Sequence, residues 1–561
     1  MVTNKYITRI ASVIMAAAVI LCLMASLFSD KLQEVYGNNA VTMKYESKLF
    51  NTDQIMDIDI LMDEDDWNNM LENAISEEYY SCNVVVNGKT FYSVGIRPKG
   101  NTSLSSIAND PDTDRYSFKL EFDHYIEGQT CYGLDKLILN NNYADATNMK
   151  EAIVYDMYQY LGVDASLYNY AKISVNGDYQ GVYLALEAVE DSFMLRNYGT
   201  EDGNLYKPES MGIGGGVDGN GFPQKGEMPD GEDFPQKDEM PDGEDFPQMG
   251  EAPNGEAADI KMGIMGGNGG ADLNYTDDDL DSYSTIWDGE ITDSDKKDHK
   301  RVVEALKNIS EGTDLETYMD VDNILKYMAV HTFVVNDDSL SGTMAHNYYL
   351  YEYNGKLNIL PWDYNLSFGG MSMGGKMGGQ SLGATSVIND AIDTPFSITD
   401  FFDALLENEE YLEQYHGYLN ELVEKYVNGG EFEKTYERIR SQIDDLVGND
   451  PTAFYSYEEY EEAANMLIEV VQLRAKSVSG QLAGTIPSTD EGQQQDSSNL
   501  IDGSDIDLSV MGSFSGGGGG NEGQGKDNGF AGTPQPFDAG DVSPISEEKA
   551  DLQDSNQDSV K

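Results

Sequence analysis

Three copies of a twelve-residue repeat near the middle of the chain limit what the remaining sequence can fold into. Residues 222–257 read FPQKGEMPDGED, FPQKDEMPDGED and FPQMGEAPNGEA, and glycine-rich sequence flanks them within 209–275. A segment so rich in Pro and Gly buries too little apolar surface to offset the entropy lost on folding. We therefore expect 209–275 to be a disordered insertion in a surface loop. Its acidic residues could bind calcium loosely, but their spacing matches no calcium-binding loop.

The overall charge excludes one class of partner. The 561 residues include 35 Lys and Arg and 100 Asp and Glu, which gives a formal net charge of −65. A chain this acidic repels a phosphate backbone, so we do not expect general nucleic-acid binding. A hydrophobic fraction of 40% still permits a sizeable core. Because residues 486–561 are rich in Gly, Ser, Asp and Gln and lack hydrophobic periodicity, we expect a disordered C-terminal tail.

The N-terminal segment predicts export. Lys5 and Arg9 precede an uncharged run over residues 10–28, IASVIMAAAVILCLMASLF. At a rise of 1.5 Å per residue, a helix of this length spans about 28 Å, close to the hydrocarbon thickness of a bilayer. We interpret residues 1–30 as a signal or membrane-anchor segment, with the rest of the chain outside the membrane. The sequence leaves cleavage of this segment open.

Residues 45–485 carry the patterns of a large α+β domain. Period-two alternation predicts strands and helical spacing predicts helices. The expected strands are 57–61, 82–86, 91–96, 116–122, 134–139, 172–175, 181–186, 347–353 and 357–360, and the expected helices are 63–74, 148–161, 301–309, 321–334, 399–426, 432–446 and 457–482. Asn-Gly pairs at 87–88, 176–177 and 354–355 predict tight hairpin turns. Cys82 and Cys131 could form a disulfide in an oxidising compartment or remain free thiols.

The segment 331–368 is the densest in polar and aromatic residues. It places Asp337 and Asp338 before a predicted hairpin and Asp363 after it, and the hairpin would return the second segment beside the first. Two carboxylates and the Asn347 amide brought together in this way form a hard-oxygen site suited to Mg²⁺ or Mn²⁺. A purely structural interpretation is also open, in which Asp338 caps a turn and Asp363 belongs to a packed loop.

Basic residues upstream could bind phosphate. Arg97 and Lys99 lie in the segment RPKGNTS between two predicted strands, beside a flexible glycine and hydroxyl donors. Such a set suits anionic phosphate oxygens, but an ordinary hairpin loop is equally consistent with it. Lys119, on the predicted strand YSFKLEF, could face a cleft and pair with a phosphate or with Glu151, or it could face solvent. Glu151 could also simply favour the dipole at the start of its helix.

The order of these parts is that of a protein-kinase-like phosphotransferase. A basic loop, a strand lysine and a helix glutamate come first, followed by an apolar hairpin that ends at Glu187 in the place of a hinge. Asp338, Asn347 and Asp363 then follow in the places of the catalytic aspartate, the metal-binding asparagine and the metal-binding aspartate. The sequence nevertheless lacks the G-x-G-x-x-G, H-R-D and D-F-G motifs of ordinary kinases.

Seven segments resemble the spore-coat CotH kinase family: RPKGNTS, YSFKLEF, LDKLILNNNYADATNMKEAIVYDMYQYLGV, NGDYQGVYLALEAVED, NLYKPE, HNYYLY and LPWDYNLSFG. The similarity extends in pieces from about residue 50 to residue 485 and omits the insertion, which is not part of the family's core pattern. The resemblance implies an atypical protein-kinase-like, two-lobed fold over residues 45–485. It also implies transfer of the γ-phosphoryl group of ATP to serine in coat proteins, with a divalent metal.

The resemblance assigns roles to the candidate residues. By motif position, Asp363 of PWDYN is a metal ligand, and Asp338 is the catalytic aspartate with Asp337 as its competitor. Asn347 is expected to be a further metal ligand. The residues expected to bind ATP are Arg97, Lys99, Lys119, Glu151 and Glu187.

The leading interpretation is therefore an exported Ser/Thr protein kinase, membrane-anchored or secreted. It would use ATP and Mg²⁺ or Mn²⁺ to phosphorylate serine in spore-coat or cell-surface proteins. The alternative is a non-catalytic surface or envelope scaffold that retains the fold. Two features favour that alternative: ATP is scarce outside cells, and glycine-rich segments suit a tether that crosses a cell wall.

Overall fold

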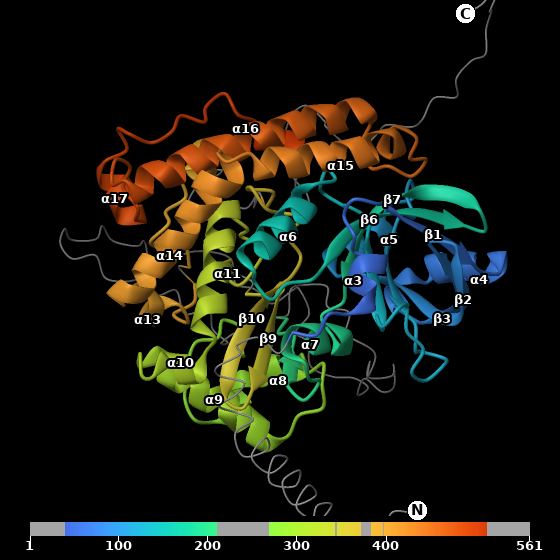
Figure 1. The fold of residues 1–561 in the computed structure, drawn as a ribbon, viewed down its shortest axis with the longest axis horizontal. Helices are drawn as coiled ribbons and strands as arrows, with labels where there is room; N and C mark the ends of the chain where they lie inside the picture. Colours follow the sequence, from blue (N-terminus) through green and yellow to red (C-terminus); the bar gives the residue numbers. More distant parts are fainter. Residues whose placement is uncertain (1–39, 210–268, 343–344, 372–382, 397, 513–561) are drawn as a thin grey trace, which may run out of the picture. The chain divides into compact units, whose positions relative to one another are not determined.

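The computed structural model describes residues 40–209, 269–342, 345–371, 383–396 and 398–512 (Figure 1). These residues all belong to one unit, Met1–Gly516. The predicted membrane segment 1–30, most of the predicted insertion 209–275, and the end of the predicted tail lie outside the described residues. Within the described ranges, none of the helices is both long enough and apolar enough to cross a bilayer.

Seven strands from the N-terminal part of the chain close into a barrel. They are β1 (Met56–Leu61), β2 (Tyr80–Val86), β3 (Lys89–Lys99), β4 (Ser117–Glu121), β5 (Lys136–Asn140), β6 (Tyr168–Val175) and β7 (Asp178–Glu187). Their order around the barrel is β1-β2-β3-β4-β5-β7-β6, and neighbours are antiparallel except β1 and β6. With the helices described below, the barrel confirms the α+β class. A closed barrel does not establish the two-lobed kinase-like arrangement, which stays a prediction.

Two predicted Asn-Gly turns form the tight ends of barrel hairpins. Asn87 and Asn176 occupy the first turn positions with φ of 49° and 52°, in the left-handed region that asparagine tolerates. Their side-chain oxygens accept hydrogen bonds from the backbone N–H groups of Asp57 and Met62, both at 3.0 Å. The turns therefore also fix the two ends of β1.

Alternate residues of the strands fill the barrel interior. On β1, Met56, Ile58 and Ile60 are buried, as the alternating sequence predicts. Cys82 and Cys131 are buried with free thiols, so the disulfide that the sequence allowed is not formed. Burial raises the pKa of each thiol to about 12.

A second, three-stranded sheet joins sequence from both sides of the insertion. β8 (Asn204–Tyr206) pairs with β9 (Tyr348–Tyr353), and β9 pairs with β10 (Lys356–Pro361) through the predicted Asn354-Gly355 turn. The prediction of a β9–β10 hairpin is confirmed. β8 was not predicted, because three residues are too few to show a period.

Long helices pack against the second sheet and the barrel. They are α6 (Lys150–Leu161), α11 (Val321–Val334), α14 (Glu409–Glu421), α15 (Glu431–Gly448) and α16 (Tyr457–Leu482). In Figure 1, α15 and α16 run along the top of the view, where α15 contacts α6 and reaches the barrel at β7. The other described helices are α3 (Lys44–Lys48), α4 (Glu64–Glu72), α5 (Thr102–Ala108), α7 (Asp191–Tyr198), α8 (Ser284–Asp288), α9 (Lys296–Ser310), α10 (Leu315–Tyr318), α12 (Ala384–Ile388), α13 (Asp403–Leu406) and α17 (Asp490–Gln495).

Two predicted boundaries were wrong. The helix predicted over 399–426 is divided: α13 is short, α14 begins at Glu409 after an Asn408 cap, and a π-helical turn covers Leu422–Val427. The chain predicted to be disordered from residue 486 is described as far as Gly512 and includes α17 and a 3₁₀ turn, Leu508–Met511. Met511 is buried, and its carbonyl accepts a hydrogen bond from the N–H of Ala146 at 3.1 Å.

Candidate functional site

The acidic loop that follows α11 brings Asp338 and Asn347 into direct contact. Val335 has a φ of 49°, which ends the helix and turns the chain into this loop. One carboxylate oxygen of Asp338 accepts a hydrogen bond from His346 Nε2 at 2.7 Å. The Asn347 amide nitrogen donates to the other oxygen at 3.1 Å and to the Asp338 carbonyl at 2.7 Å. Asp337, the competing candidate, is exposed, whereas Asp338 is half-buried between these two donors.

Asp363 lies beside this loop, directly after β10. Its φ of 60° is unusual for a residue other than glycine and marks a constrained turn. Burial raises the pKa of the Asp363 carboxyl; the positive charge of Lys99 opposes this rise, and the negative charge of Asp338 adds to it. The Asn336 amide donates to the Asp363 carbonyl at 3.4 Å, so the acidic loop and the segment after β10 lie side by side.

Lys99 and Glu151 are linked through one amide. Lys99 Nζ donates to Asn140 Oδ1 at 3.3 Å, and Asn140 Nδ2 donates to Glu151 Oε2 at 2.9 Å. Burial lowers the pKa of Lys99, while the charges of Asp363 and Glu151 oppose the shift. Burial and the nearby Asp363 raise the pKa of Glu151 to about 8. Its second oxygen, Oε1, is buried without a hydrogen-bond partner among the described residues.

The pairing of Lys119 with Glu151, one of the alternatives that the sequence left open, is not formed. Lys119 Nζ instead donates to Glu190 at 2.7 Å, and Lys136 pairs with the other oxygen of the same carboxylate. The register of β3 and β4 explains the difference, since Arg97 lies opposite Lys119 and Lys99 lies opposite Ser117. Lys99, not Lys119, therefore lies at the level of Asn140.

Arg97 and Lys99 are on a strand rather than in the expected loop, because β3 continues to Lys99. Arg97 forms an ion pair with Glu77 and donates to the Pro98 carbonyl at 3.2 Å. Its guanidinium also lies 5.4 Å from the centre of the Tyr79 ring. These contacts hold Arg97 at the barrel, and its predicted role in ATP binding stays a prediction.

Glu187 lies in a different environment from the Lys99 group. Its buried carboxylate accepts hydrogen bonds from Arg196 at 2.6 and 2.9 Å, from the Tyr45 hydroxyl at 2.5 Å and from the Leu167 N–H at 3.1 Å. These bonds join the end of β7 to α7 and α3. The structure does not bring Glu187 together with the other candidates, and its predicted contact with ATP stays a prediction.

Sequence reasoning missed Lys207, which follows β8 directly. Lys207 Nζ lies 2.6 Å from Glu209 Oε1. Its positive charge opposes the rise that burial causes in the pKa of Asp363, and it adds to the fall that burial causes in the pKa of Lys99. The pKa of Glu209 is lowered chiefly by Lys207. The sequence signal of Lys207 is the segment NLYKPE, one of the seven segments that resemble the family, but the motif assigns no role to its lysine.

A chain of buried hydrogen bonds connects Tyr364, which follows Asp363, to Asn336, which precedes the acidic pair Asp337 and Asp338. The Tyr158 hydroxyl bonds to the Tyr364 hydroxyl at 2.5 Å, and Tyr364 bonds to His331 Nδ1 at 3.0 Å. His331 Nε2 lies 2.8 Å from Ser341 Oγ, which donates to the Asn336 carbonyl at 3.1 Å. Burial lowers the pKa of His331 to about 3, so the ring is neutral and can accept on one nitrogen while it donates on the other.

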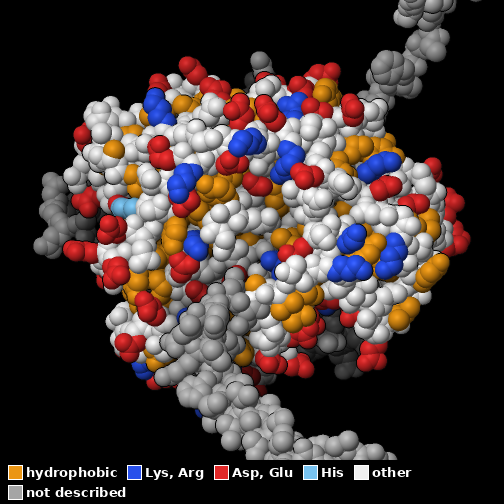
Figure 2. All heavy atoms as spheres, viewed as in Figure 1, with side chains coloured by type: hydrophobic (Ala, Val, Ile, Leu, Met, Phe, Trp, Pro, Cys, Tyr) orange, Lys and Arg blue, Asp and Glu red, His pale blue; other side chains and the backbone are white. Residues whose placement is uncertain are grey.

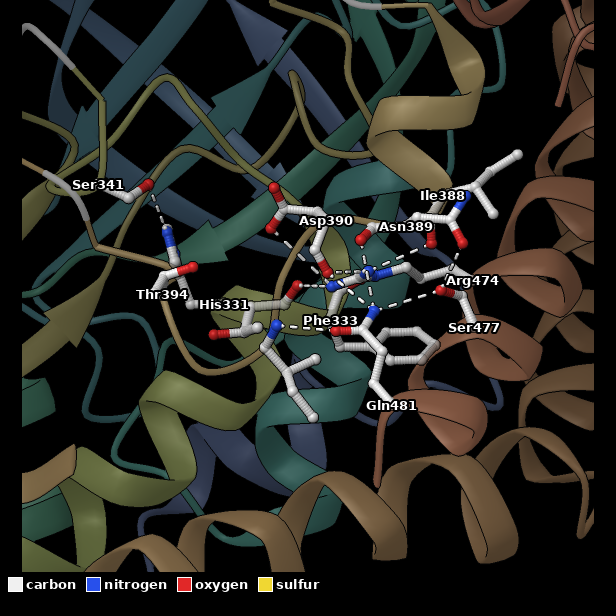
Figure 3. A network of polar contacts seen from close by, with 12 residues as sticks. His331, Phe333, Ser341, Ile388, Asn389, Asp390, Thr394, Arg474, Ser477 and Gln481 are labelled. Carbon is white, nitrogen blue, oxygen red and sulfur yellow. Dashed lines mark hydrogen bonds and ion pairs between the residues drawn. The ribbon is translucent and has the colours of Figure 1, made fainter. Parts of the chain in front are cut away.

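Arg474 of α16 supports the same region. Its guanidinium is buried and donates to the carbonyls of Thr332, Phe333, Ile388 and Asp390 (Figure 3). The first two carbonyls belong to the end of α11, immediately before the acidic loop. Figure 3 also shows the His331–Ser341 hydrogen bond close to this network. The neutral His331 ring and the Arg474 guanidinium thus hold the start of the loop that carries Asp338.

The donor set suits a hard divalent cation. Asp363 supplies carboxylate oxygens, and Asn347 directs its amide nitrogen to Asp338, which leaves the Asn347 oxygen available as a ligand. The unpartnered Glu151 oxygen adds a buried acceptor nearby. Among the residues that the structure describes, no cluster of three or more His, Cys, Asp or Glu side chains has the geometry of a metal site. The oxygen ligands are of the kind that Mg²⁺ or Mn²⁺ prefers, although the described side chains do not form a complete metal site.

Comparison with known proteins identifies the family. The family described as CotH kinase protein matches residues 96–478, which include both acidic segments, Lys99 and Glu151. No curated protein matches the chain significantly. The match covers more than half of the chain and contains the site described above. The chain therefore belongs to the CotH kinase family.

Proposed function

We propose that the chain is an ATP-dependent protein kinase that transfers the γ-phosphoryl group to a serine or threonine hydroxyl. The observation that carries this proposal is the convergence of the Asp338–Asn347 pair with Asp363 and the Lys99–Asn140–Glu151 chain. Phosphoryl transfer depends mainly on positioning and on neutralising charge, and these residues offer both. The barrel and the helical part would then take the places of the two kinase lobes.

Lys99 would bind phosphate oxygens of the nucleotide. Its ammonium group is half-buried and is held by Asn140, so an anionic phosphate beside it would offset the cost of desolvation. Glu151, through the same amide, would keep Lys99 aimed at the nucleotide. Lys207 lies in the same electrostatic environment and adds a second positive charge.

Asp338 would orient the acceptor hydroxyl and accept its proton. Its two oxygens are fixed by His346 and Asn347, so the carboxylate presents one defined direction to the substrate. Asp363 and the Asn347 oxygen would hold Mg²⁺ or Mn²⁺. When bound, the cation would neutralise charge that develops on the phosphoryl oxygens.

A transfer assay on the full chain tests the proposal. With γ-³²P-ATP, Mg²⁺ and a serine-rich acceptor, the wild-type chain should label the acceptor or itself. Asp338→Asn should lower the rate about 100-fold or more, the size expected for loss of a positioned proton acceptor, while Mg-ATP binding persists. Asp337→Asn is the matched control and should retain most activity. If the two variants behave alike, Asp338 does not have the proposed role.

We also propose that the chain acts outside the cytoplasm on serine-containing surface or spore-coat proteins. The apolar run over residues 10–28 supports export, and the resemblance of the sequence motifs to the spore-coat CotH kinase family supports a coat substrate. Protease added to intact cells should digest the domain if it is exported. Protection of the domain until the cells are lysed would contradict this location.

A further inference from the structure

The turn between α15 and α16 contacts the barrel through a buried ion pair. Nη1 of Arg115 lies 2.8 and 2.9 Å from the two carboxylate oxygens of Asp450 and 2.7 Å from Thr452 Oγ1. The side chains of Arg115 and Asp450 are each 2% exposed. Breaking such a pair is costly, because removal of one partner leaves an uncompensated buried charge.

The barrel is shaped to receive this turn. Gly181 on β7 has a φ of 138°, and a Cβ at this position would lie 2.6 Å from an Asp450 oxygen. The next residue, Val182, donates its N–H to Asp450 at 3.1 Å and accepts at its carbonyl from Arg115 Nη2 at 2.7 Å. The contact therefore involves both the backbone of β7 and a charged pair.

Arg115 connects the turn to the segment that carries Asn140. Its Nε donates to the carbonyl of Asn141 at 3.1 Å, and the Asn141 amide donates back to the Arg115 carbonyl at 2.6 Å. Asn141 follows directly after Asn140, which bonds to both Lys99 and Glu151. A single peptide unit thus separates the residue that Arg115 holds from the bridge in the candidate site.

A second contact leads from the same turn to the Asp363 segment. The Phe454 ring packs edge-on against Tyr143, with ring centres 5.3 Å apart. The Tyr143 carbonyl accepts a hydrogen bond from Asn365 Nδ2 at 3.0 Å. Asn365 is two residues after Asp363, so the turn is connected to both halves of the site.

We propose that Arg115, Asp450 and Thr452 are positioning residues for the nucleotide site. We call these three residues the Arg115 clamp. The proposal rests on the proposed function and deepens it, because it names what holds Asn140 between Lys99 and Glu151. Release of the clamp frees the end of β5, which lengthens the hydrogen bonds of Asn140 and misdirects Lys99.

A matched control distinguishes a positioning role of the Arg115 clamp from a purely structural one. Arg438 is a second arginine, on α15, that joins this helix to the barrel side and also lies 3.6 Å from Asp156 of α6. It donates to the Thr52 carbonyl at 3.0 Å and to the Tyr168 hydroxyl at 2.9 Å. In the part of the chain that the structure describes, its hydrogen bonds do not reach residues 140–143. Loss of Arg438 should therefore lower stability without changing the nucleotide site.

The test compares Mg-ATP affinity, measured by calorimetry, in full-length variants that retain wild-type circular dichroism. Asp450→Asn and Thr452→Val should each weaken Mg-ATP binding about tenfold, the loss typical of residues that support a site without touching the ligand. Thr452→Ser keeps the hydroxyl and should bind as the wild type does. Arg438→Gln should stay within about twofold of the wild type even where its melting temperature falls.

Each outcome decides between the proposals. If Asp450→Asn does not fold, Thr452→Val and Thr452→Ser provide the comparison, because both keep the ion pair. Equal affinities in Thr452→Val and Thr452→Ser, or an equal loss in Arg438→Gln, would overturn the clamp while the proposed kinase function stands. If the wild-type chain binds no Mg-ATP, the proposed function fails and the clamp fails with it.

Discussion

Lys99 and Lys119 lie on adjacent strands of the barrel and have different partners. Lys99 bonds to the Asn140 amide, whereas Lys119 and Lys136 share Glu190. The side-chain period of a strand is two, so a shift of register decides which lysine meets which partner. The register between β3 and β4 is a long-range property, and the local sequence of either strand does not contain it. The sequence therefore singled out both lysines as candidates, but it could not decide which of them lies near Glu151.

Substitution of each lysine by methionine should have a different effect. Lys99→Met should abolish measurable Mg-ATP binding, because the phosphate oxygens lose their positioned cation. Lys119→Met should leave Mg-ATP affinity within about threefold and instead destabilise the fold by about 1–3 kcal/mol, since Glu190 keeps only Lys136. Calorimetry with Mg-ATP and urea unfolding measure the two effects. Loss of binding in Lys119→Met with retention in Lys99→Met would reverse the assignment.

His331 predicts how stability depends on pH. Its pKa is lowered to about 3 in the folded protein, and its ordinary value is about 6.5. The stability it contributes is therefore complete above about pH 6.5 and is lost as the pH falls toward 3, because the unfolded chain takes up the proton first. Between pH 7.5 and pH 5, urea unfolding should show a loss about 2 kcal/mol larger in the wild type than in His331→Gln. Parallel losses in the two proteins would show that His331 is not buried in its neutral form.

At the level of helices and strands, α16 was predicted well, whereas the helix predicted over 399–426 is divided and two segments without a period were missed. The 26-residue helix α16 begins and ends where its sequence pattern does. β8 has only three residues, and the 486–512 segment lacks a repeat, so neither produces a periodic signal. Their positions depend on tertiary contacts: β8 on pairing with β9, and the C-terminal segment on burial of Met511.

The C-terminal segment gives a prediction at this scale. A chain that ends at Gly512 should keep the melting temperature of the full chain. A chain that ends at Thr485 should lose about 2–4 kcal/mol of unfolding free energy, because Met511 and the partly buried Ile506 and Leu508 leave the core. Urea unfolding of the two truncations measures the difference. Equal stabilities would show that residues 486–512 do not belong to the folded domain.

At the scale of the whole molecule, the insertion leaves and re-enters the described structure at the two ends of one short helix. The Lys207 N–H donates to the Gly289 carbonyl at 2.7 Å, just after α8, and the Thr285 N–H donates to the Gly269 carbonyl at 3.0 Å, near its start. Five residues of helix span about 7 Å, which a short linker can bridge. The prediction that sequence from both sides contributes to one fold is supported by the β8–β9 pairing.

Replacement of residues 210–268 by a short Gly-Ser linker should therefore leave the melting temperature within about 3 °C and leave Mg-ATP affinity unchanged. Calcium titration of the same deletion tests whether the acidic repeats bind that ion. Unfolding of the deletion protein would show that the insertion contributes to the core.

Acidic side chains are distributed over the face shown in Figure 2, with Lys and Arg in smaller groups between them. The positive charges of Lys99 and Lys207 at the candidate site contrast with the acidic side chains of this face. The sequence predicted the hairpin that separates Asp338 and Asn347 from Asp363, because its two strands and its Asn-Gly turn are local signals. It did not predict Asn140, Lys207 or the Arg115 clamp, since each reaches the site through strand register or through helices far along the chain.

Calorimetric titration of Mg-ATP into the full chain asks whether Asp363 and the residues around Lys99 form one nucleotide site. Asp363→Asn is the comparison, because asparagine tolerates the left-handed conformation of this residue while it removes the charge. We expect saturable, magnesium-dependent binding in the wild type and at least about tenfold weaker binding in the folded variant. No magnesium-dependent binding in the wild type, or equal affinity in the two proteins, would contradict this expectation.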